Sequence, residues 1–290
     1  MLRARRLAKQ YGNVHAVRGI DLDVEAGTIV GLVGNNGAGK TTTLKLLAGL
    51  VAPSAGDIEL AGGDPQVPAT RRAMGFLPED SPLYDDQTPL QYLAFFARLY
   101  DMPKRDARRR AQDLLRRLRL DEPFWRRPIG QLSKGSARKV AIARALLHDP
   151  AVLLLDEPTS GLDPATQADL DAFLADLRAR GKAILLSAHD MRQVEALCDR
   201  IILVHEGRVA AEGSLDELRA QYGGTTYHLT ATLPFAGSSP DGASNTGAFP
   251  SLAAAEAAMQ TVRTQGGSIL RLDTRSPGLE AILERVVRGP

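Results

Sequence analysis

Residues 34–42 read Gly-Asn-Asn-Gly-Ala-Gly-Lys-Thr-Thr, between a short apolar run at 28–33 and a helical pattern at 42–48 that Gly49 closes. This GxxxxGK(S/T) pattern constrains the fold strongly, because it requires a strand, a tight loop and a helix in immediate succession. The glycines let successive N–H groups point inward, and the helix adds the positive end of its dipole. The pattern therefore favours a loop that cradles phosphates, with an ordinary glycine-rich turn as the alternative.

The residue types in this loop predict distinct contacts with a nucleotide. Lys40 can reach the β- and γ-phosphates, and the Thr41 hydroxyl can bind Mg²⁺. We expect the other loop residues to contact the nucleotide as well, and these are Gly34, Asn35, Asn36, Gly37, Ala38, Gly39 and Thr42.

A second set of acidic residues ends an apolar strand far along the chain. Asp156 and Glu157 follow the run Val152–Leu155, and the pleat sends their side chains in different directions. Asp156 is suited to hold Mg²⁺ directly or through water, and Glu157 is the candidate general base for a water aligned with the γ-phosphate. The alternative is an ordinary strand end that turns into solvent before Pro158.

Composition sets the broad class of the protein. The chain has 290 residues, 44% of them hydrophobic, which is enough for one full α/β domain and a smaller one. Its 36 basic and 34 acidic residues leave a charge of +2, so no global attraction to nucleic acid is implied. No apolar run approaches the roughly 20 residues of a membrane helix, and Met1–Arg6 precede no apolar segment. We therefore expect a cytosolic protein, in which the single Cys198 is a buried thiol.

The hydrophobic pattern predicts an α/β core. Continuous apolar runs at 151–155 and 183–186 are typical of parallel strands that helices cover on both faces. The strand-rich segment 1–83 predicts a β lobe around the phosphate loop.

A helical lobe is expected at about residues 84–135. Thr88 and Gln91 form a capping box around Pro89 at its start. A second helix at about 106–120 carries arginines along one side, which predicts either a solvated face or contact with a partner or acidic lipid head groups.

The pattern changes again near residue 224. Period-two alternation at 226–233 predicts a strand of a new domain, so we divide the chain into a domain at 1–224 and an accessory domain at 225–290. The accessory domain contains an alanine-rich helix, a short strand at 269–272 and a last helix that Ser276 and Pro277 begin, which predicts a small α+β fold.

Three further motifs complete the pattern. Leu132-Ser133-Lys134-Gly135-Ser136 precedes a helical run, Ser160–Asp163 follows the paired carboxylates, and His189 ends the next strand. Alone, Ser133 is typical of a simple helix cap. Together, the order and spacing of these elements over about residues 3–218 resemble the ATP-binding-cassette (ABC) ATPases. The resemblance implies an α/β P-loop NTPase core with an antiparallel β lobe, an α-helical lobe and the C-terminal accessory domain.

The resemblance also implies roles around ATP in one subunit. Tyr11 matches the aromatic residue that stacks on adenine, with Val17 nearby, although a half-buried strand tyrosine is the alternative. His189 matches the histidine that can bridge the γ-phosphate and the attacking water. The implied catalytic set is Glu157, His189 and Lys40.

Other matching residues imply a dimer. Ser133 and Gly135 match the signature motif, which in this family contacts the γ-phosphate bound to the opposite subunit. Asp163 matches a loop that crosses the dimer interface.

The chain departs from the common family pattern at three places. Glu79 stands where the family usually has glutamine, and it is expected to ligate Mg²⁺ while adding negative charge near the γ-phosphate. The signature motif reads LSKGS in place of LSGGQ. In the phosphate loop, Asn35 stands where proline is common. Three features resemble the ABC-2-type exporter ATPases. They are the loop with Pro78 and Glu79, the sequence LSKG at 132–135 and the segment Pro277–Glu280.

The resemblance implies an ATP- and Mg²⁺-dependent ATPase subunit of an ABC exporter. It implies a homodimer, or pairing with a related ATPase subunit, on the cytoplasmic face of the membrane through a separate membrane-spanning permease. No nucleic-acid partner is expected. The alternatives are a soluble ABC ATPase without a transport role, an importer ATPase subunit and a scaffold that binds ATP without hydrolysing it.

Overall fold

The computed structural model describes residues 1–224, 226–275 and 277–288. It divides into two compact units, Met1–Glu212 and Gly213–Pro290. The second unit begins before the boundary that the sequence pattern suggests at 224/225, because it includes the helix α8 (Leu215–Tyr222).

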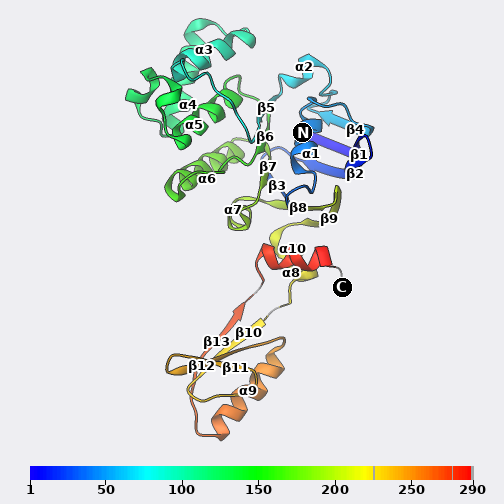
Figure 1. Ribbon diagram of the computed structural model, residues 1–290, viewed down its shortest axis with the longest axis vertical. Coiled ribbons are helices and arrows are strands. Elements are labelled where there is room, and N and C mark those ends of the chain that lie inside the picture. Colours follow the sequence, from blue (N-terminus) through cyan, green and yellow to red (C-terminus); the bar gives the residue numbers. More distant parts are fainter. Residues whose placement is uncertain (225, 276, 289–290) are drawn as a thin grey trace. The chain divides into compact units, whose positions relative to one another are not determined.

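A six-stranded sheet forms the centre of the first unit, with strand order β5-β6-β7-β3-β8-β9 (Figure 1). The pairs β5/β6, β6/β7, β7/β3 and β3/β8 are parallel, as the continuous apolar runs predict. All residues of β3, β6 and β7 are buried. The strands are β3 (Ile29–Val33), β5 (Met74–Leu77), β6 (Val152–Asp156), β7 (Ala183–Ala188), β8 (Arg200–His205) and β9 (Arg208–Gly213).

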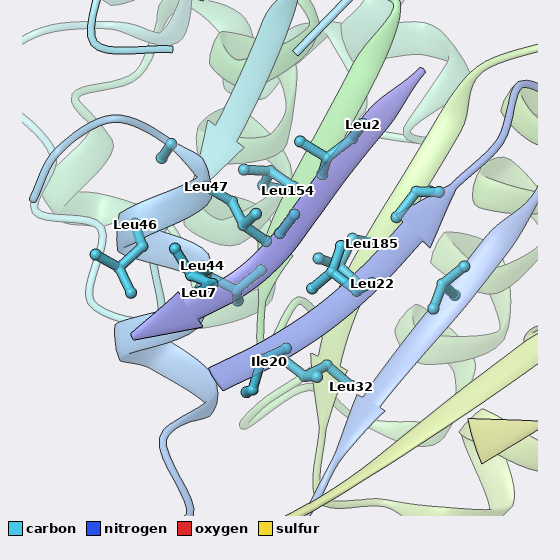
Figure 2. Packing of buried hydrophobic residues seen from close by; sticks show 14 of the residues in the cluster. Leu2, Leu7, Ile20, Leu22, Leu32, Leu44, Leu46, Leu47, Leu154 and Leu185 are labelled. Carbon is cyan, nitrogen blue, oxygen red and sulfur yellow. The ribbon is translucent and has the colours of Figure 1, made fainter. Parts of the chain in front are cut away.

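An antiparallel β lobe packs against this core. Its strand order is β2-β1-β4, and both pairings are antiparallel, which confirms the predicted lobe. Figure 2 shows leucines of β1, such as Leu2 and Leu7, beside Leu44 of α1 and Leu154 of β6. These side chains are completely buried, so the lobe, the helix after the phosphate loop and the sheet share one hydrophobic core. The elements are β1 (Leu2–Tyr11), β2 (Val14–Val24), β4 (Ala55–Leu60) and α1 (Lys40–Leu47).

The helix α3 of the first unit begins at its predicted cap. Thr88 accepts from the Gln91 amide and Gln91 bonds back to the Thr88 amide, so the capping box is confirmed. The helices are α2 (Pro68–Arg71), α3 (Pro89–Leu99), α4 (Lys104–Arg117), α5 (Lys134–Leu146), α6 (Pro164–Ala179) and α7 (Met191–Leu197), with short 3₁₀ turns at Glu122–Arg126 and Ile129–Gln131.

The arginine face of α4 is only partly solvated, contrary to the simpler expectation. Arg117 pairs with Asp176 of α6 at 2.6 Å, and Arg110 pairs with Asp149 at 2.8 Å. These two side chains are mostly covered, so the arginines attach the helical lobe to the core in addition to facing water.

In the part of the second unit that the structure describes, a four-stranded antiparallel sheet with strand order β11-β12-β10-β13 is accompanied by three helices, as predicted for an α+β domain. Leu229 and Ala231 of β10 pack with Phe235 and with Ala258 and Val262 of α9. Ser276, expected to begin the last helix, lies outside the described residues. The elements besides α8 are β10 (Thr226–Ala231), β11 (Ser238–Asp241), β12 (Ser244–Phe249), α9 (Leu252–Thr264), β13 (Ile269–Arg275) and α10 (Leu279–Arg288).

Within the described residues, none of the helices has the length and apolarity needed to span a bilayer.

Candidate functional site

A cavity of about 670 Å³ lies where the phosphate loop meets the carboxyl ends of the central strands. It brings together residues from the start of β2, the loop and α1, the segment after β5, and the ends of β6 and β7. The lining residues are Val14, His15, Ala16, Asn36, Gly37, Gly39, Lys40, Thr41, Thr42, Glu79, Glu157 and His189. Lys40, Thr41, Glu79, Glu157 and His189, predicted from separate motifs, therefore face one space.

The phosphate loop has the backbone that its glycines predict. Gly39 has φ 103°, and a Cβ atom there would lie 2.5 Å from the Ala16 carbonyl oxygen, so only glycine fits. Gly39 also caps α1 without any side-chain hydrogen bond to the first turn. The first amides of α1 are thus not capped by a side chain, as an anion-binding helix terminus requires.

Lys40 is buried within this loop, with 8% of its surface exposed. Its ammonium group donates to the carbonyl oxygens of Gly34 at 2.6 Å and Asn35 at 3.3 Å. Carbonyl dipoles offset only part of the cost of burying a cation. A phosphate group would supply the opposite charge that this ammonium group requires.

One hydroxyl group on the neighbouring strand contacts both acidic residues, the carboxylate of Asp156 and the main-chain amide of Glu157. Ser187 of β7 is fully buried; it accepts from the Glu157 amide at 3.0 Å and donates to Asp156 Oδ1 at 2.6 Å. Glu157 has φ 49°, a left-handed conformation that costs a non-glycine residue roughly 1–3 kcal/mol. The Ser187 hydroxyl helps to hold this conformation, which presents the Glu157 side chain to the cavity.

His189 contacts the Glu157 carboxylate directly. Its Nδ1 atom lies 2.6 Å from Glu157 Oε2. An ionised carboxylate only accepts hydrogen bonds, so Nδ1 carries the proton in this contact. The imidazole side chain is 64% exposed at the cavity, whereas the Glu157 side chain is 11% exposed. The pair therefore combines an oriented base with a ring that can reach a bound group.

The oxygen atoms around the cavity fit Mg²⁺. Asp156 Oδ2 is buried and has no hydrogen-bond partner among the described residues. The Thr41 hydroxyl and the Glu79 carboxylate add two further hard oxygen donors. The described residues contain no group of three or more His, Cys, Asp or Glu side chains that could hold a metal. A magnesium ion here would need phosphate oxygens and water to complete its six ligands.

Nine predicted site residues do not line the cavity, and four of these lie within the phosphate loop or at the end of β6, namely Gly34, Asn35, Ala38 and Asp156. Tyr11 is 47% exposed, with the Lys9 ammonium group 5.0 Å from its ring centroid, and Val17 is fully buried. Ser133 caps α5 by accepting from the Ser136 amide. The remaining residues are Gly135 and Asp163, and the Asp163 carboxylate accepts from the amides of Ala165 and Thr166 at the start of α6.

Hydrogen bonds from the Thr166 side chain and amide lower the pKa of Asp163. This aspartate therefore remains charged at neutral pH while it caps α6.

Sequence reasoning missed part of the cavity wall. Val14, His15 and Ala16 form the β1–β2 part of the lining, although only Tyr11 and Val17 were expected from this hairpin. The available signal for His15 was a histidine close in sequence to Tyr11, the expected adenine contact. For Ser187, the signal was a polar residue within an apolar strand that ends at His189.

Comparisons with known proteins agree with this architecture. A family model described as ABC transporter matches residues 17–160. The chain is 40% identical over 218 residues to the ABC transporter ATP-binding protein NatA of Bacillus subtilis (strain 168), covering 74% of this chain and 88% of that protein. It is 42% identical over 214 residues to the Nod factor export ATP-binding protein I of Burkholderia orbicola (strain AU 1054), covering 72% and 69%.

Solved structures show the same fold. The dimeric structure of MJ0796, a bacterial ABC transporter cassette, matches with a TM-score of 0.69 and 28% identity over 74% of this chain and 99% of that one. A dimeric post-hydrolysis state of MJ0796 bound to ADP and Pi matches with a TM-score of 0.68, also at 28% identity and the same coverage.

Proposed function

Because the chain belongs to the family of ABC transporter ATP-binding proteins, we propose that it is the ATP-hydrolysing subunit of an ABC exporter whose membrane-spanning permease is a separate protein. One observation carries the ATPase assignment: Lys40, Thr41, Glu157 and His189 face a single cavity, and Glu157 contacts His189 at 2.6 Å. The export relative named above supports the direction of transport.

The chain's own residues account for the chemistry of ATP hydrolysis. The loop amides and the Lys40 ammonium group hold the β- and γ-phosphates. Glu157 accepts a proton from the attacking water, the water oxygen bonds to the γ-phosphorus, and the bond from phosphorus to the ADP oxygen breaks. His189 orients the Glu157 carboxylate through its Nδ1 atom, and its exposed ring can reach the attacking water. Asp156, Thr41 and Glu79 would hold Mg²⁺, which when bound supplies positive charge that offsets the charge of the phosphates.

We place two copies of the chain, or one copy and a related ATPase subunit, head to tail around two ATP molecules. Ser133, Gly135 and Asp163 do not line the chain's own cavity, and a role at the partner's nucleotide accounts for that separation. The MJ0796 cassette is described as dimeric, which supports the pairing of two such chains. The permease would hold the pair at the cytoplasmic face of the membrane.

Co-purification tests the transporter assignment. The tagged chain is solubilised from cell membranes in mild detergent, and a polytopic membrane protein is expected to co-elute and to raise its ATPase rate. Recovery only from the soluble fraction, without such a partner, would favour a soluble ABC ATPase. A co-eluting permease with a periplasmic or lipoprotein substrate-binding subunit would favour an importer.

The first testable prediction concerns the stacking of Tyr11 on the adenine ring. Tyr11→Ala is expected to weaken ATP binding by about 1 kcal/mol, less than tenfold, through the loss of one aromatic contact. Titration calorimetry with the non-hydrolysing Glu157→Gln background would measure it. His15→Ala is the comparison, because the His15 side chain lines the cavity. Unchanged affinity in Tyr11→Ala with a loss in His15→Ala would move the stacking role to His15.

Glu79 yields a second prediction, about magnesium. Glu79→Gln is expected to weaken apparent Mg²⁺ affinity by roughly threefold to tenfold, because one exposed charge contributes about 1 kcal/mol and glutamine keeps a ligating oxygen. ATPase activity at saturating Mg²⁺ should be largely preserved, since Glu157 is intact.

Activity is measured against Mg²⁺ concentration at fixed ATP. Asp80→Asn is the control, because Asp80 is the exposed neighbour of Glu79 and does not line the cavity. Identical magnesium curves for the parent and Glu79→Gln would refute the ligand role.

A further inference from the structure

Arg138 of α5 contacts the two loops that carry Glu79 and Glu157. Its Nη1 atom donates to the carbonyl oxygens of Pro78 at 3.0 Å and Glu79 at 2.8 Å. Its Nη2 atom donates to the carbonyl oxygens of Asp156 at 2.8 Å and Glu157 at 2.7 Å, and its Nε atom donates to that of Pro158 at 3.2 Å.

These contacts use the complete donor set of the guanidinium group. Arginine has five N–H donors in a rigid planar fork, and the structure gives it five main-chain acceptors. A lysine ammonium group has three donors and could not span both loops in the same way. The residue is half-buried, and burial lowers its pKa while the carboxylates of Asp156 and Glu79 oppose that shift. The guanidinium group nevertheless stays charged at neutral pH.

The contacts of Arg138 matter because Glu157 lies in a strained backbone conformation. The Ser187 hydroxyl holds the Glu157 amide from one side of the peptide chain, and Arg138 holds the Glu157 carbonyl. Arg138 also fixes the main chain of Glu79, which carries the other carboxylate in the cavity. One side chain thus sets the separation of both carboxylates by bonds to their backbones and without lining the cavity itself.

We infer that Arg138 is a positioning residue for ATP hydrolysis, which fixes the main chain of Glu157 and Glu79 relative to α5, the helix that Ser133 caps. This inference rests on the proposed function, because it presumes that Glu157 is the base. Arg138 touches no substrate in this account. It acts by holding Glu157 where its carboxylate can reach the attacking water.

Initial rates of phosphate release against ATP concentration test the inference at saturating Mg²⁺. In Arg138→Gln the kcat is expected to fall roughly tenfold to hundredfold, as for a reacting group displaced by about 1 Å. The KM for ATP should stay within about threefold of the parent, because the phosphate loop is intact. Arg138→Lys should recover kcat only in part, since it restores the charge but not the five bonds.

Arg144→Gln is the matched control. Arg144 lies on the same helix and is also half-buried, but it bonds to the Tyr92 hydroxyl and lies over the Phe96 ring in the helical lobe. Its kcat and KM should both stay near those of the parent. Thermal unfolding midpoints are recorded for every variant, and rates are compared well below the lowest midpoint. If Arg138→Gln does not fold, Arg138→Lys carries the comparison.

Three results would overturn the inference. These are a parent-like kcat in Arg138→Gln, a full recovery in Arg138→Lys, and a rise in KM that accounts for the whole loss of kcat/KM. An inactive parent would overturn the proposed function, and this inference with it. An active parent beside an equally active Arg138→Gln would overturn the inference alone.

Discussion

Lys40→Ala is expected to weaken ATP binding by roughly tenfold to hundredfold and to reduce ATP turnover to background. The substitution removes a buried cation whose charge-assisted bonds to phosphate contribute about 1.5–3 kcal/mol. The ammonium group lies on the carbonyl oxygens of Gly34 and Asn35 at the wall of the cavity. No other lysine or arginine side chain lines that cavity in the described part of the chain. Titration calorimetry and phosphate release measure the two effects.

Lys45→Ala controls for the removal of a lysine from the same helix. Lys45 is exposed in the last turn of α1 and does not line the cavity. It should bind and hydrolyse ATP like the parent. An equal loss in both variants would indicate a general defect of α1, and parent-like turnover in Lys40→Ala would contradict the phosphate-binding role.

Glu157→Gln is expected to bind ATP but to hydrolyse it about 10²–10⁴-fold more slowly, which is the range for the loss of a general base. Glutamine keeps the shape of the side chain and its bond to His189, so ground-state binding should be preserved. The ATP-bound dimer should then accumulate, because hydrolysis no longer opens it. Light scattering after gel filtration in ATP and Mg²⁺ measures the dimer.

Glu59→Gln is the control for this change, since Glu59 is an exposed carboxylate of β4 away from the cavity. It should hydrolyse ATP at the parent rate and show no trapped dimer. A Glu157→Gln variant that stays monomeric with ATP bound would contradict the head-to-tail dimer.

Much of the fold could be predicted because its signals are local. The glycine-rich loop requires φ values that few residues adopt, and Gly39 has φ 103° as expected. The apolar runs at 151–155 and 183–186 predict buried parallel strands because they place apolar side chains on both faces of each strand. The strands β6 and β7 are buried throughout. The capping box at Thr88 and Gln91 predicts the start of α3 from residues three positions apart.

The candidate site was predictable where a motif ends a strand and unpredictable where side chains meet across the fold. Lys40, Glu157 and His189 follow their strands into one cavity, because carboxyl ends of parallel strands share one edge of a sheet. Arg138 bonds to residues 59 or 60 positions earlier in the chain and 18 to 20 positions later, and no local pattern reveals such contacts. The same holds for the pair Arg117 and Asp176. The roles of Tyr11, Ser133 and Asp163 stay predictions.

Phosphate release by the parent, Lys40→Ala and Glu157→Gln, measured with bound ATP on the same samples, tests most directly whether this cavity hydrolyses ATP. The account predicts that the parent releases many phosphates per chain and that both variants fall to background. Glu157→Gln should still bind one ATP per chain, whereas Lys40→Ala should not. A parent that binds ATP stoichiometrically yet releases no phosphate would contradict the account and favour an ATP-dependent scaffold. Parent-like release by Glu157→Gln would also contradict it, by removing the base from the proposed mechanism.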